Sequence, residues 1–249
     1  MRDMKALVLT AGNGTRFAKE SQKSIHKCLA EINGKRIVDF SLDVAVKLGL
    51  EEIVMVVGHL AEAIMQTCGA SYQGIPIKYA LQVEQRGLVH AMTRGQEALK
   101  GSDFCLFLGD EVFIQADHTG MLHTFYTQDA FLTCGIVLTD NLELIRKNYS
   151  VAFDELSQHV LCITEKPSEP FNTFIGTGSC VFRHEIFDYV HTMPNDPRTG
   201  NKELAGLVQC AIDDQRRVLC YNLRALHYTN INTYKDLLRL EYALAGVKL

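Results

Sequence analysis

The chain has 249 residues, of which 47% are hydrophobic and 22% are charged. These proportions are ordinary for a globular protein, and the length allows one large α/β domain or two small ones. The formal net charge of −4 gives no sign of a basic surface for nucleic acid, and no apolar run is long enough to span a bilayer.

The cysteine pattern predicts a reducing compartment. Eight cysteines are scattered along the chain with no C-x-x-C pair, which excludes the common spacing of zinc ligands. Cys105 and Cys180 lie inside apolar runs, where a free thiol behaves as a small hydrophobic group. Because the first residues also lack the pattern of a signal peptide, we expect a cytoplasmic protein.

The first half of the chain alternates β-rich runs with helical patterns. In chain order we expect a strand at 6–9, a helix at 37–48, a strand at 52–57, a helix at 61–68, a strand at 77–81, a helix at 87–99 and a strand at 104–108. This rhythm predicts a parallel sheet with helices on both faces. Right-handed crossovers then bring the carboxyl ends of the strands to one edge, where ligands bind.

The second half of the chain changes character. Short polar turns separate apolar runs, which suggests antiparallel pieces. We expect strands at 131–138, 150–153, 160–164 and 178–182, helices at 185–190 and 202–215, a strand at 217–222 and a closing helix at 234–246. No repeat or linker is visible. The chain is therefore predicted to be one α/β domain over residues 1–249, a Rossmann-like three-layer sandwich with a mainly parallel mixed sheet and a small antiparallel part.

The glycine-rich turn after the first strand is the most informative segment. Residues 7–17 read L-V-L-T-A-G-N-G-T-R-F, so an apolar strand runs directly into a turn that ends on a cation. Gly12 and Gly14 let the backbone lie close to a bound group, and the free N–H groups of such a turn suit an anion. Arg16 adds a planar, permanently charged fork for phosphate oxygens. We interpret this turn as a site for a nucleoside triphosphate.

Two other phosphate-binding motifs fit this segment less well. A P-loop needs a Gly-Lys-Ser/Thr ending that is absent here. A dinucleotide-binding turn needs a third glycine, and Phe17 stands at that position. Asp110 follows the expected strand at 104–108, and a carboxylate at a strand end suits Mg²⁺, which takes few protein ligands together with substrate phosphates.

Motifs along most of the chain resemble those of the sugar-phosphate nucleotidyltransferases, which have a glycosyltransferase-A-like fold. The first turn is similar to the family signature L-A-A-G-x-G-T-R. The further matches are His26-Lys27-Cys28-Leu29 for P-K-x-L, Gln82 with Gly87 and Ala91 for Q-x-x-x-x-G-x-x-x-A, Leu108-Gly109-Asp110 for L-G-D, Glu165-Lys166-Pro167 for E-K-P, Gly176-Thr177-Gly178 before an apolar strand, and the closing segment 230–237. Each motif is weak alone, but their order and spacing make the resemblance strong.

The resemblance implies a reaction and a set of site residues. A phosphate of the acceptor attacks the α-phosphorus of a nucleoside triphosphate in line and expels pyrophosphate, which requires positioning and charge neutralisation but no nucleophilic side chain. The implied catalytic residues are Arg16, Lys27 and Lys166; the nucleotide-binding residues are Leu9, Ala11, Gly12, Asn13, Gly14, Thr15, Gln82, Gly87 and Gly109; the acceptor-binding residues are Glu165, Lys166 and Gly178; and the ligands of Mg²⁺ are Asp110 and Asn232. Residues 1–115 then form the nucleotide-binding half and residues 116–249 the acceptor-binding half.

Three of these assignments carry more specific expectations. The amide of Gln82 offers a donor and an acceptor to a base edge, and Gly87 allows the base to approach the backbone. Pro167 favours an extended backbone at Lys166, which would aim this side chain at the acceptor phosphate.

The chain departs from the family pattern at three positions. His26 stands in place of the usual proline. Asn230 stands where many relatives have a metal-binding aspartate, so Asn230 or Asn232 is the second ligand, and an uncharged amide should hold the metal more weakly. The role of Glu111, where the family often has a neutral residue, is left open.

We predict an enzyme that makes a nucleoside diphosphate sugar from a nucleoside triphosphate and a sugar 1-phosphate. The alternatives are a cytidylyltransferase for a phosphorylated alcohol such as phosphocholine, which the His26-Lys27 pair favours, and a catalytically inactive nucleotide-sugar sensor, which Asn230 favours. A Rossmann-type dehydrogenase fits least. No nucleic acid or membrane partner is expected, and a homo-oligomer is possible; neither the base nor the acceptor can be named from the sequence.

Overall fold

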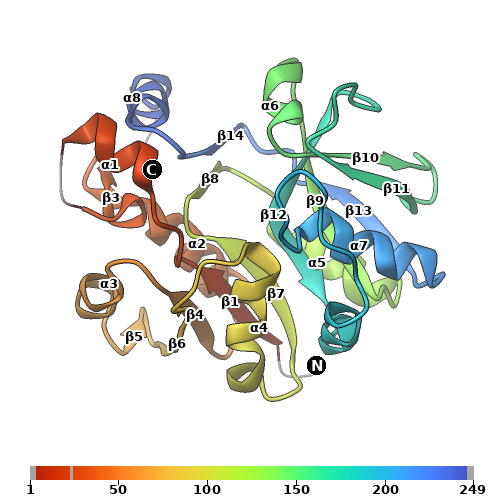
Figure 1. Ribbon diagram of the computed structural model, residues 1–249, viewed down its shortest axis with the longest axis horizontal. Coiled ribbons are helices and arrows are strands. Elements are labelled where there is room, and N and C mark those ends of the chain that lie inside the picture. Colours follow the sequence, from red (N-terminus) through yellow and green to blue (C-terminus); the bar gives the residue numbers. More distant parts are fainter. Residues whose placement is uncertain (1–3, 23–24, 246–249) are drawn as a thin grey trace.

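The computed structural model describes residues 4–22 and 25–245, and Figure 1 shows its arrangement. A ten-stranded mixed sheet runs through the molecule in the order β11-β10-β12-β7-β1-β4-β6-β5, with β9 beside β12 and β13 beside β9. Its strands are β1 (Met4–Leu9), β4 (Ile53–Val57), β5 (Ser71–Tyr72), β6 (Ile75–Leu81), β7 (Asp103–Leu108), β9 (Leu132–Leu138), β10 (Tyr149–Phe153), β11 (Val160–Glu165), β12 (Phe174–Phe182) and β13 (Val218–Asn222).

The sheet has a parallel centre and an antiparallel side, as the sequence predicted. β1 pairs in parallel with β4 and with β7, and β4 pairs in parallel with β6. β12 is antiparallel to β7, β9 and β10, and β10 is antiparallel to β11. The carboxyl ends of β1, β4 and β7 therefore meet at one edge of the sheet.

Helices cover both faces of the sheet. The helices are α1 (Thr15–Ser21), α2 (Ile37–Lys47), α3 (Ala61–Cys68), α4 (Leu88–Leu99), α5 (His118–Thr127), α6 (Leu142–Arg146), α7 (Leu204–Asp213) and α8 (Tyr234–Ala243), with the 3₁₀ helices η1 (Lys27–Leu29) and η2 (His184–Val190). Alternate residues of β1 divide between two apolar cores, because successive side chains of a strand point to opposite faces. Leu7 belongs to the core that also contains residues of α4, η2 and α7, and Val8 belongs to the core that also contains residues of α2, α3 and α5.

A third apolar core lies beside the edge where the parallel strands end. Phe17 of α1, Phe40 of α2 and Leu240 of α8 belong to it, so the last helix packs against the first. In Figure 1, α8 and α1 are accordingly neighbours at the upper left. The sequence had no way to indicate this contact from local patterns.

Most of the predicted elements are confirmed, with ends that differ by a few residues. The expected helix at 185–190 is the 3₁₀ helix η2, and the end of the expected closing helix at Gly246 lies outside the described residues. The sequence missed α1, α5, α6, the hairpin of β2 (Glu31–Ile32) and β3 (Lys35–Arg36), and the two-stranded ribbon of β8 (Glu111–Ile114) and β14 (His227–Asn230). Among the described helices none has the length and apolar character to cross a membrane.

Candidate active site

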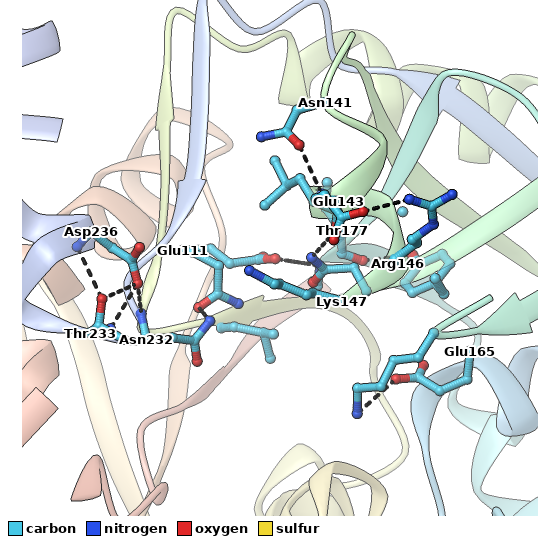
Figure 2. A pocket seen from close by; sticks show the side chains of 18 of the residues that line it. Glu111, Asn141, Glu143, Arg146, Lys147, Glu165, Thr177, Asn232, Thr233 and Asp236 are labelled. Atoms are coloured by element: carbon cyan, nitrogen blue, oxygen red, sulfur yellow. Dashed lines mark hydrogen bonds and ion pairs between the residues drawn. The ribbon is translucent and has the colours of Figure 1, made fainter. Parts of the chain in front are cut away.

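A cavity of about 650 Å³ opens at the edge of the sheet where the parallel strands end. Its walls come from α1, β8, β14 and α8 on one side and from α6, β12 and the end of β11 on the other (Figure 2). Figure 2 shows Glu111, Asn232 and Asp236 facing Arg146 and Glu165 across it. Both signs of charge line the walls: the cations are Arg16, Arg146, Lys147, Lys166, Lys235 and Arg239, and the acids are Glu20, Glu111, Glu143, Glu165, Glu203 and Asp236.

The predicted glycine turn runs from the end of β1 to the start of α1. Thr10 anchors it, because its N–H and its hydroxyl both donate to the carbonyl of Val56, at 2.8 and 2.9 Å. Gly14 has a φ of 57° and is the N-cap of α1, a conformation that favours glycine. Asn13 and Thr15 flank it in the turn and in the first turn of the helix.

His26 fastens the glycine turn to η1. Its Nδ1 accepts the N–H of Cys28 at 3.2 Å, so its Nε2 carries the proton and donates to the carbonyl of Gly12 at 2.9 Å. Burial lowers the pKa of His26, which keeps the ring neutral and preserves this arrangement. The proline that the family usually has at this position could make neither contact.

Lys27 and Asp110 form an ion pair at this edge. The side chains are 11% and 17% exposed, and Nζ of Lys27 contacts Oδ2 of Asp110. The stem of Lys27 passes Gly14, where an added Cβ would lie 3.6 Å from Cγ of Lys27. Burial by itself lowers the pKa of Lys27, but the charge of Asp110 outweighs it and the pKa lies above its usual value. Lys27 is therefore held protonated next to the glycine turn.

The ribbon of β8 and β14 brings the two asparagines to Asp110. The N–H of Ile231 donates to the carbonyl of Asp110 at 2.8 Å, and Asn230 lies opposite Glu111 in the ribbon. Asn232 donates to Oδ1 of Asn230 at 3.0 Å and accepts a hydrogen bond from Arg16 at 3.3 Å. Arg16 and Asn232 are 216 residues apart in the chain, so only the fold brings them together.

The donors around Asp110 suit a hard cation. Among residues 4–22 and 25–245 no group of three or more His, Cys, Asp or Glu side chains could hold a metal ion. Asp110 offers a carboxylate here, and Asn230 and Asn232 of the neighbouring segment offer amide oxygens. All are oxygens, and so small a set fits Mg²⁺, which takes its other ligands from phosphates and water.

Glu111 is a functional candidate whose role the sequence left open. It is 2% exposed, both of its carboxylate oxygens accept the N–H of Gly178 at 3.0 Å, and Oε1 also accepts the hydroxyl of Tyr228 at 2.6 Å. Burial raises the pKa of Glu111 to about 7. A Cβ on Gly178 would lie 2.2 Å from Cγ of Leu108, so only glycine fits this position. Glu111, which follows Asp110 in the chain, thus connects β8 to β12.

Glu165 and Lys166, here called the acceptor segment, lie at the carboxyl end of β11. Glu165 and Lys166 line the cavity, and Nζ of Lys166 lies 3.3 Å from Oε1 of Glu165. Burial raises the pKa of Glu165. The expectation of an extended backbone at Lys166 is wrong, since this residue has a φ of 41°. The reason is tertiary: the N–H of Lys166 donates to the carbonyl of Asn148 at 2.5 Å, and Arg198 donates to its carbonyl at 2.7 Å, and these contacts override the preference imposed by Pro167.

The residues predicted to meet the base lie beside the glycine turn, outside the lining of the cavity. Gln82 is 3% exposed, and its Nε2 lies 3.3 Å from the carbonyl of Gly87 and 2.9 Å from Nδ1 of His90. Gly87 has a φ of 89° and begins α4. The backbone of Gly58 lies close to both the glycine turn and Gln82. An added Cβ on Gly58 would lie 2.8 Å from the carbonyl oxygen of Ala11 and 3.0 Å from that of Gln82.

The structure thus connects most of the predicted site. The cavity lining includes Arg16, Glu165, Lys166, Gly178, Asn230 and Asn232. Lys27 and Asp110 join that wall through the ribbon, and the N–H of Gly109 donates to the carbonyl of Leu9 at 2.9 Å, which ties the ends of β1 and β7 together. Gly58 was missed, although a glycine directly after an apolar strand was an available signal. His26 was noted as a replacement of the usual proline, but its hydrogen bonds to Gly12 and Cys28 were not foreseen.

The chain is similar in sequence to known proteins along most of its length. A family model described as nucleotidyl transferase matches residues 5–245. A UTP–glucose-1-phosphate uridylyltransferase, AglF, of Haloferax volcanii is 32% identical over 225 residues, which cover 86% of each chain. A glucose-1-phosphate thymidylyltransferase of Xanthomonas campestris pv. campestris is 29% identical over 219 residues, covering 86% of this chain and 71% of the relative.

Solved structures share the fold at low identity. A putative glucose-1-phosphate thymidylyltransferase from Bacillus anthracis, solved in complex with a sucrose, has a TM-score of 0.85 and 17% identity, covering 99% of this chain and 97% of that one. A UDP-glucose pyrophosphorylase complexed with UDP-glucose has a TM-score of 0.86 and 18% identity over the whole of both chains. With a family model that spans nearly its full length, the chain belongs to the nucleotidyl transferase family.

Proposed function

We propose that this protein transfers a nucleotidyl group from a nucleoside triphosphate to a sugar 1-phosphate. A phosphate oxygen of the sugar 1-phosphate forms a bond to the α-phosphorus, the bond from that phosphorus to the bridging oxygen of the β-phosphate breaks, and pyrophosphate leaves with the electron pair. One observation carries the proposal: Arg16, two residues after Gly14 of the glycine turn, lines the same cavity as Glu165 and Lys166.

The residues have separate tasks in this proposal. Arg16 and the protonated Lys27 neutralise the triphosphate, because the reaction spreads negative charge over phosphate oxygens. Lys166 binds the acceptor phosphate, and Glu165 accepts hydrogen bonds from sugar hydroxyls. Gln82 and Gly87 meet the base, next to the turn of Leu9, Ala11 and Gly12.

We also propose that Asp110 and Asn232 hold Mg²⁺. Asn232 is preferred over Asn230 as the second ligand, because the hydrogen bond that its Oδ1 accepts from Arg16, at 3.3 Å, is longer than the one that Oδ1 of Asn230 accepts from Asn232, at 3.0 Å. When bound, the ion supplies positive charge to the phosphate oxygens. Lys27 pairs with Oδ2 of the same carboxylate, which keeps both side chains in place for the triphosphate.

The relatives favour uridine or thymidine triphosphate with glucose 1-phosphate as the first substrates to test, since the relatives in H. volcanii and X. campestris are named for these pairs. They do not favour the cytidylyltransferase alternative. We place the enzyme in the cytoplasm, with which its eight free cysteines are consistent.

The test is a panel assay of pyrophosphate release. Each common nucleoside triphosphate is combined with a set of sugar 1-phosphates and with phosphocholine, in the presence of Mg²⁺. We expect release with UTP or dTTP and a hexose 1-phosphate. Release with CTP and phosphocholine alone would establish the alternative. Calorimetric binding of a nucleotide sugar with no release from any pair would instead indicate an inactive sensor.

A further inference from the structure

The segment of residues 194–203, here called the bridging loop, touches both sides of the site. It connects η2 to α7. At one end the N–H of Val89, in the first turn of α4, donates to the carbonyl of Lys202 at 3.4 Å, and an added Cβ on Gly87 would lie 2.9 Å from Cβ of Asn201. In the middle of the loop, Arg198 reaches the acceptor segment. The loop therefore spans from the residues proposed to meet the base to those proposed to bind the acceptor.

Arg198 donates hydrogen bonds to two successive carbonyl groups of the acceptor segment. Its Nη1 donates to the carbonyl of Lys166 at 2.7 Å, and its Nη2 donates to the carbonyl of Glu165 at 2.5 Å. The planar guanidinium presents its donors in a fixed fork, so one side chain can fix both peptide groups. A lysine ammonium is a single point charge and cannot reproduce this geometry.

Asp196 holds the fork in place. Its Oδ2 accepts from Nη2 of Arg198 at 3.0 Å, and its Oδ1 accepts the N–H groups of Arg198 and Thr199 at 2.8 and 3.2 Å. The backbone of Asp196 is tied to the same loop, because its N–H donates to the carbonyl of Asn201 at 2.8 Å. Hydrogen bonds within the loop thus fix the backbone and the guanidinium of Arg198, although its side chain is 49% exposed.

The acceptor segment needs such support. Lys166 has a φ of 41°, in the left-handed region that residues with a Cβ rarely adopt, and it precedes a proline, which restricts it further. A residue in such a conformation keeps it only where the surroundings determine it. Two contacts do so here, the hydrogen bond to Asn148 on one side and the Arg198 fork on the other.

We propose that Arg198 is a positioning residue for the acceptor site: by binding the carbonyls of Glu165 and Lys166, it holds both side chains toward the cavity for the sugar 1-phosphate. The inference rests on the proposed function for the identity of the acceptor. The geometric part, that Arg198 fixes the conformation of the acceptor segment, stands on the hydrogen bonds alone.

The kinetic test compares Arg198→Ala and Arg198→Lys with Arg216→Ala. Arg216 is a matched control, because it is also 49% exposed and also pairs with an aspartate two residues earlier, Asp214, but has no contact with the acceptor segment. For Arg198→Ala we expect KM for the sugar 1-phosphate to rise roughly tenfold, with KM for the triphosphate changed less than about twofold, since two charge-assisted hydrogen bonds are lost. Arg198→Lys should recover only part of this loss, and Arg216→Ala should match the wild type.

Two kinetic results overturn the proposal in a wild-type enzyme that turns over. One is an unchanged KM for the sugar 1-phosphate in Arg198→Ala. The other is an equal rise of KM for both substrates, which would mean a general loss of structure.

Hydrogen exchange supplies a readout that needs no turnover. The amide of Lys166 should exchange faster in Arg198→Ala than in the wild type and in Arg216→Ala, and equal exchange overturns the proposal. Should the wild type release no pyrophosphate with any substrate pair, the proposed function fails, and this measurement still decides whether Arg198 holds the segment.

Discussion

At the scale of single residues, the ion pair of Lys27 and Asp110 is largely shielded from water beside the proposed site. The side chains are 11% and 17% exposed, and each neutralises the other next to the glycine turn. When one partner of such a pair is removed, the remaining charge is left buried and unpaired, which is costly. The two residues therefore serve stability as well as the proposed chemistry.

Asp110→Asn should abolish Mg²⁺-dependent pyrophosphate release, because the only carboxylate proposed to bind the ion is lost. It should also lower the free energy of unfolding by about 1–3 kcal/mol, since Lys27 loses its partner. The rate of pyrophosphate release measures the first effect, and urea unfolding measures the second. Asp43→Asn is the control, because it breaks the Lys35–Asp43 pair outside the cavity and should leave the rate unchanged. Normal turnover of Asp110→Asn would contradict the metal role.

Lys166→Ala should raise KM for the sugar 1-phosphate more than KM for the triphosphate, because we assign this cation to the acceptor phosphate. The measurement is a pair of saturation curves, each at a fixed excess of the other substrate. Lys100→Ala is a suitable control, since Lys100 is an exposed lysine that also has a positive φ, of 52°, and lies at the end of α4. A larger rise of KM for the triphosphate than for the sugar 1-phosphate would contradict the assignment of Lys166 to the acceptor phosphate.

His118 predicts a pH dependence of stability. Burial lowers the pKa of His118 to about 4, and its Nε2 lies 3.2 Å from the hydroxyl of Ser179. A histidine whose folded pKa lies below its unfolded value binds more protons when unfolded, so stability is present above pH 6.5 and is lost as the pH falls toward 4, by up to about 3 kcal/mol.

Urea unfolding of the wild type and of His118→Gln between pH 4.5 and 7.5 measures this loss. We expect a smaller loss in the variant. Glu111 works in the opposite direction, because its raised pKa makes it lose stability as the pH rises toward 7, but it is present in both proteins and cancels in their difference. Equal slopes of the free energy of unfolding against pH in the two proteins would mean that His118 is charged or exposed in the folded state.

At the scale of elements, the site depends on strands that the sequence did not reveal. β8 has four residues, and β14 reads His-Tyr-Thr-Asn, so neither shows the apolar alternation that marks a strand. They form because each supplies the other with hydrogen-bond partners, which is a tertiary effect. α5 was missed for a similar reason: it begins His-Thr-Gly and has a weak apolar period, although Met121 and Phe125 pack in the core.

Gly178→Ala tests how tightly β12 packs against the ribbon. The new Cβ would lie 2.2 Å from Cγ of Leu108 and 2.8 Å from Oε2 of Glu111, so we expect a loss of about 1–3 kcal/mol of unfolding free energy and a lower rate. Gly206→Ala in α7 is the matched control, because its nearest neighbour would be Cε of Met193 at 3.4 Å and alanine favours a helix. Equal stability of the two variants would contradict tight packing of β12 against the ribbon at Gly178.

At the scale of the whole molecule, the site is assembled from both ends of the chain. The third apolar core packs α8 against α1, and this places Asn232, just before α8, beside Arg16 in α1. A ligand that contacts both segments therefore stabilises the global fold rather than one loop. Figure 1 shows these two helices next to each other although they come from opposite ends of the sequence.

The bound nucleotide should accordingly raise the melting temperature. At a concentration of about 100 times Kd, a ligand that binds only the folded state adds about 2.7 kcal/mol, which corresponds to roughly 5–10 °C for a domain of this size. We expect this shift with UTP or dTTP in the presence of Mg²⁺ and a much smaller one in Asp110→Asn. A shift of the same size in that variant would show that the carboxylate does not take part in binding.

By itself the sequence determined the alternation of strands and helices, the glycine turn after β1 and the aspartate after β7. These features are local, since each follows from side chains within a few positions of one another, and parallel strands bring their ends to one edge in any such sheet. Only the tertiary structure decided the contacts of Arg16 with Asn232, Glu111 with Gly178 and Arg198 with Lys166. These pairs lie 216, 67 and 32 residues apart, and no local preference encodes them: even the proline after Lys166 was overridden. The physical reason is that a hydrogen bond between distant segments forms only after the cores have packed and fixed where those segments lie.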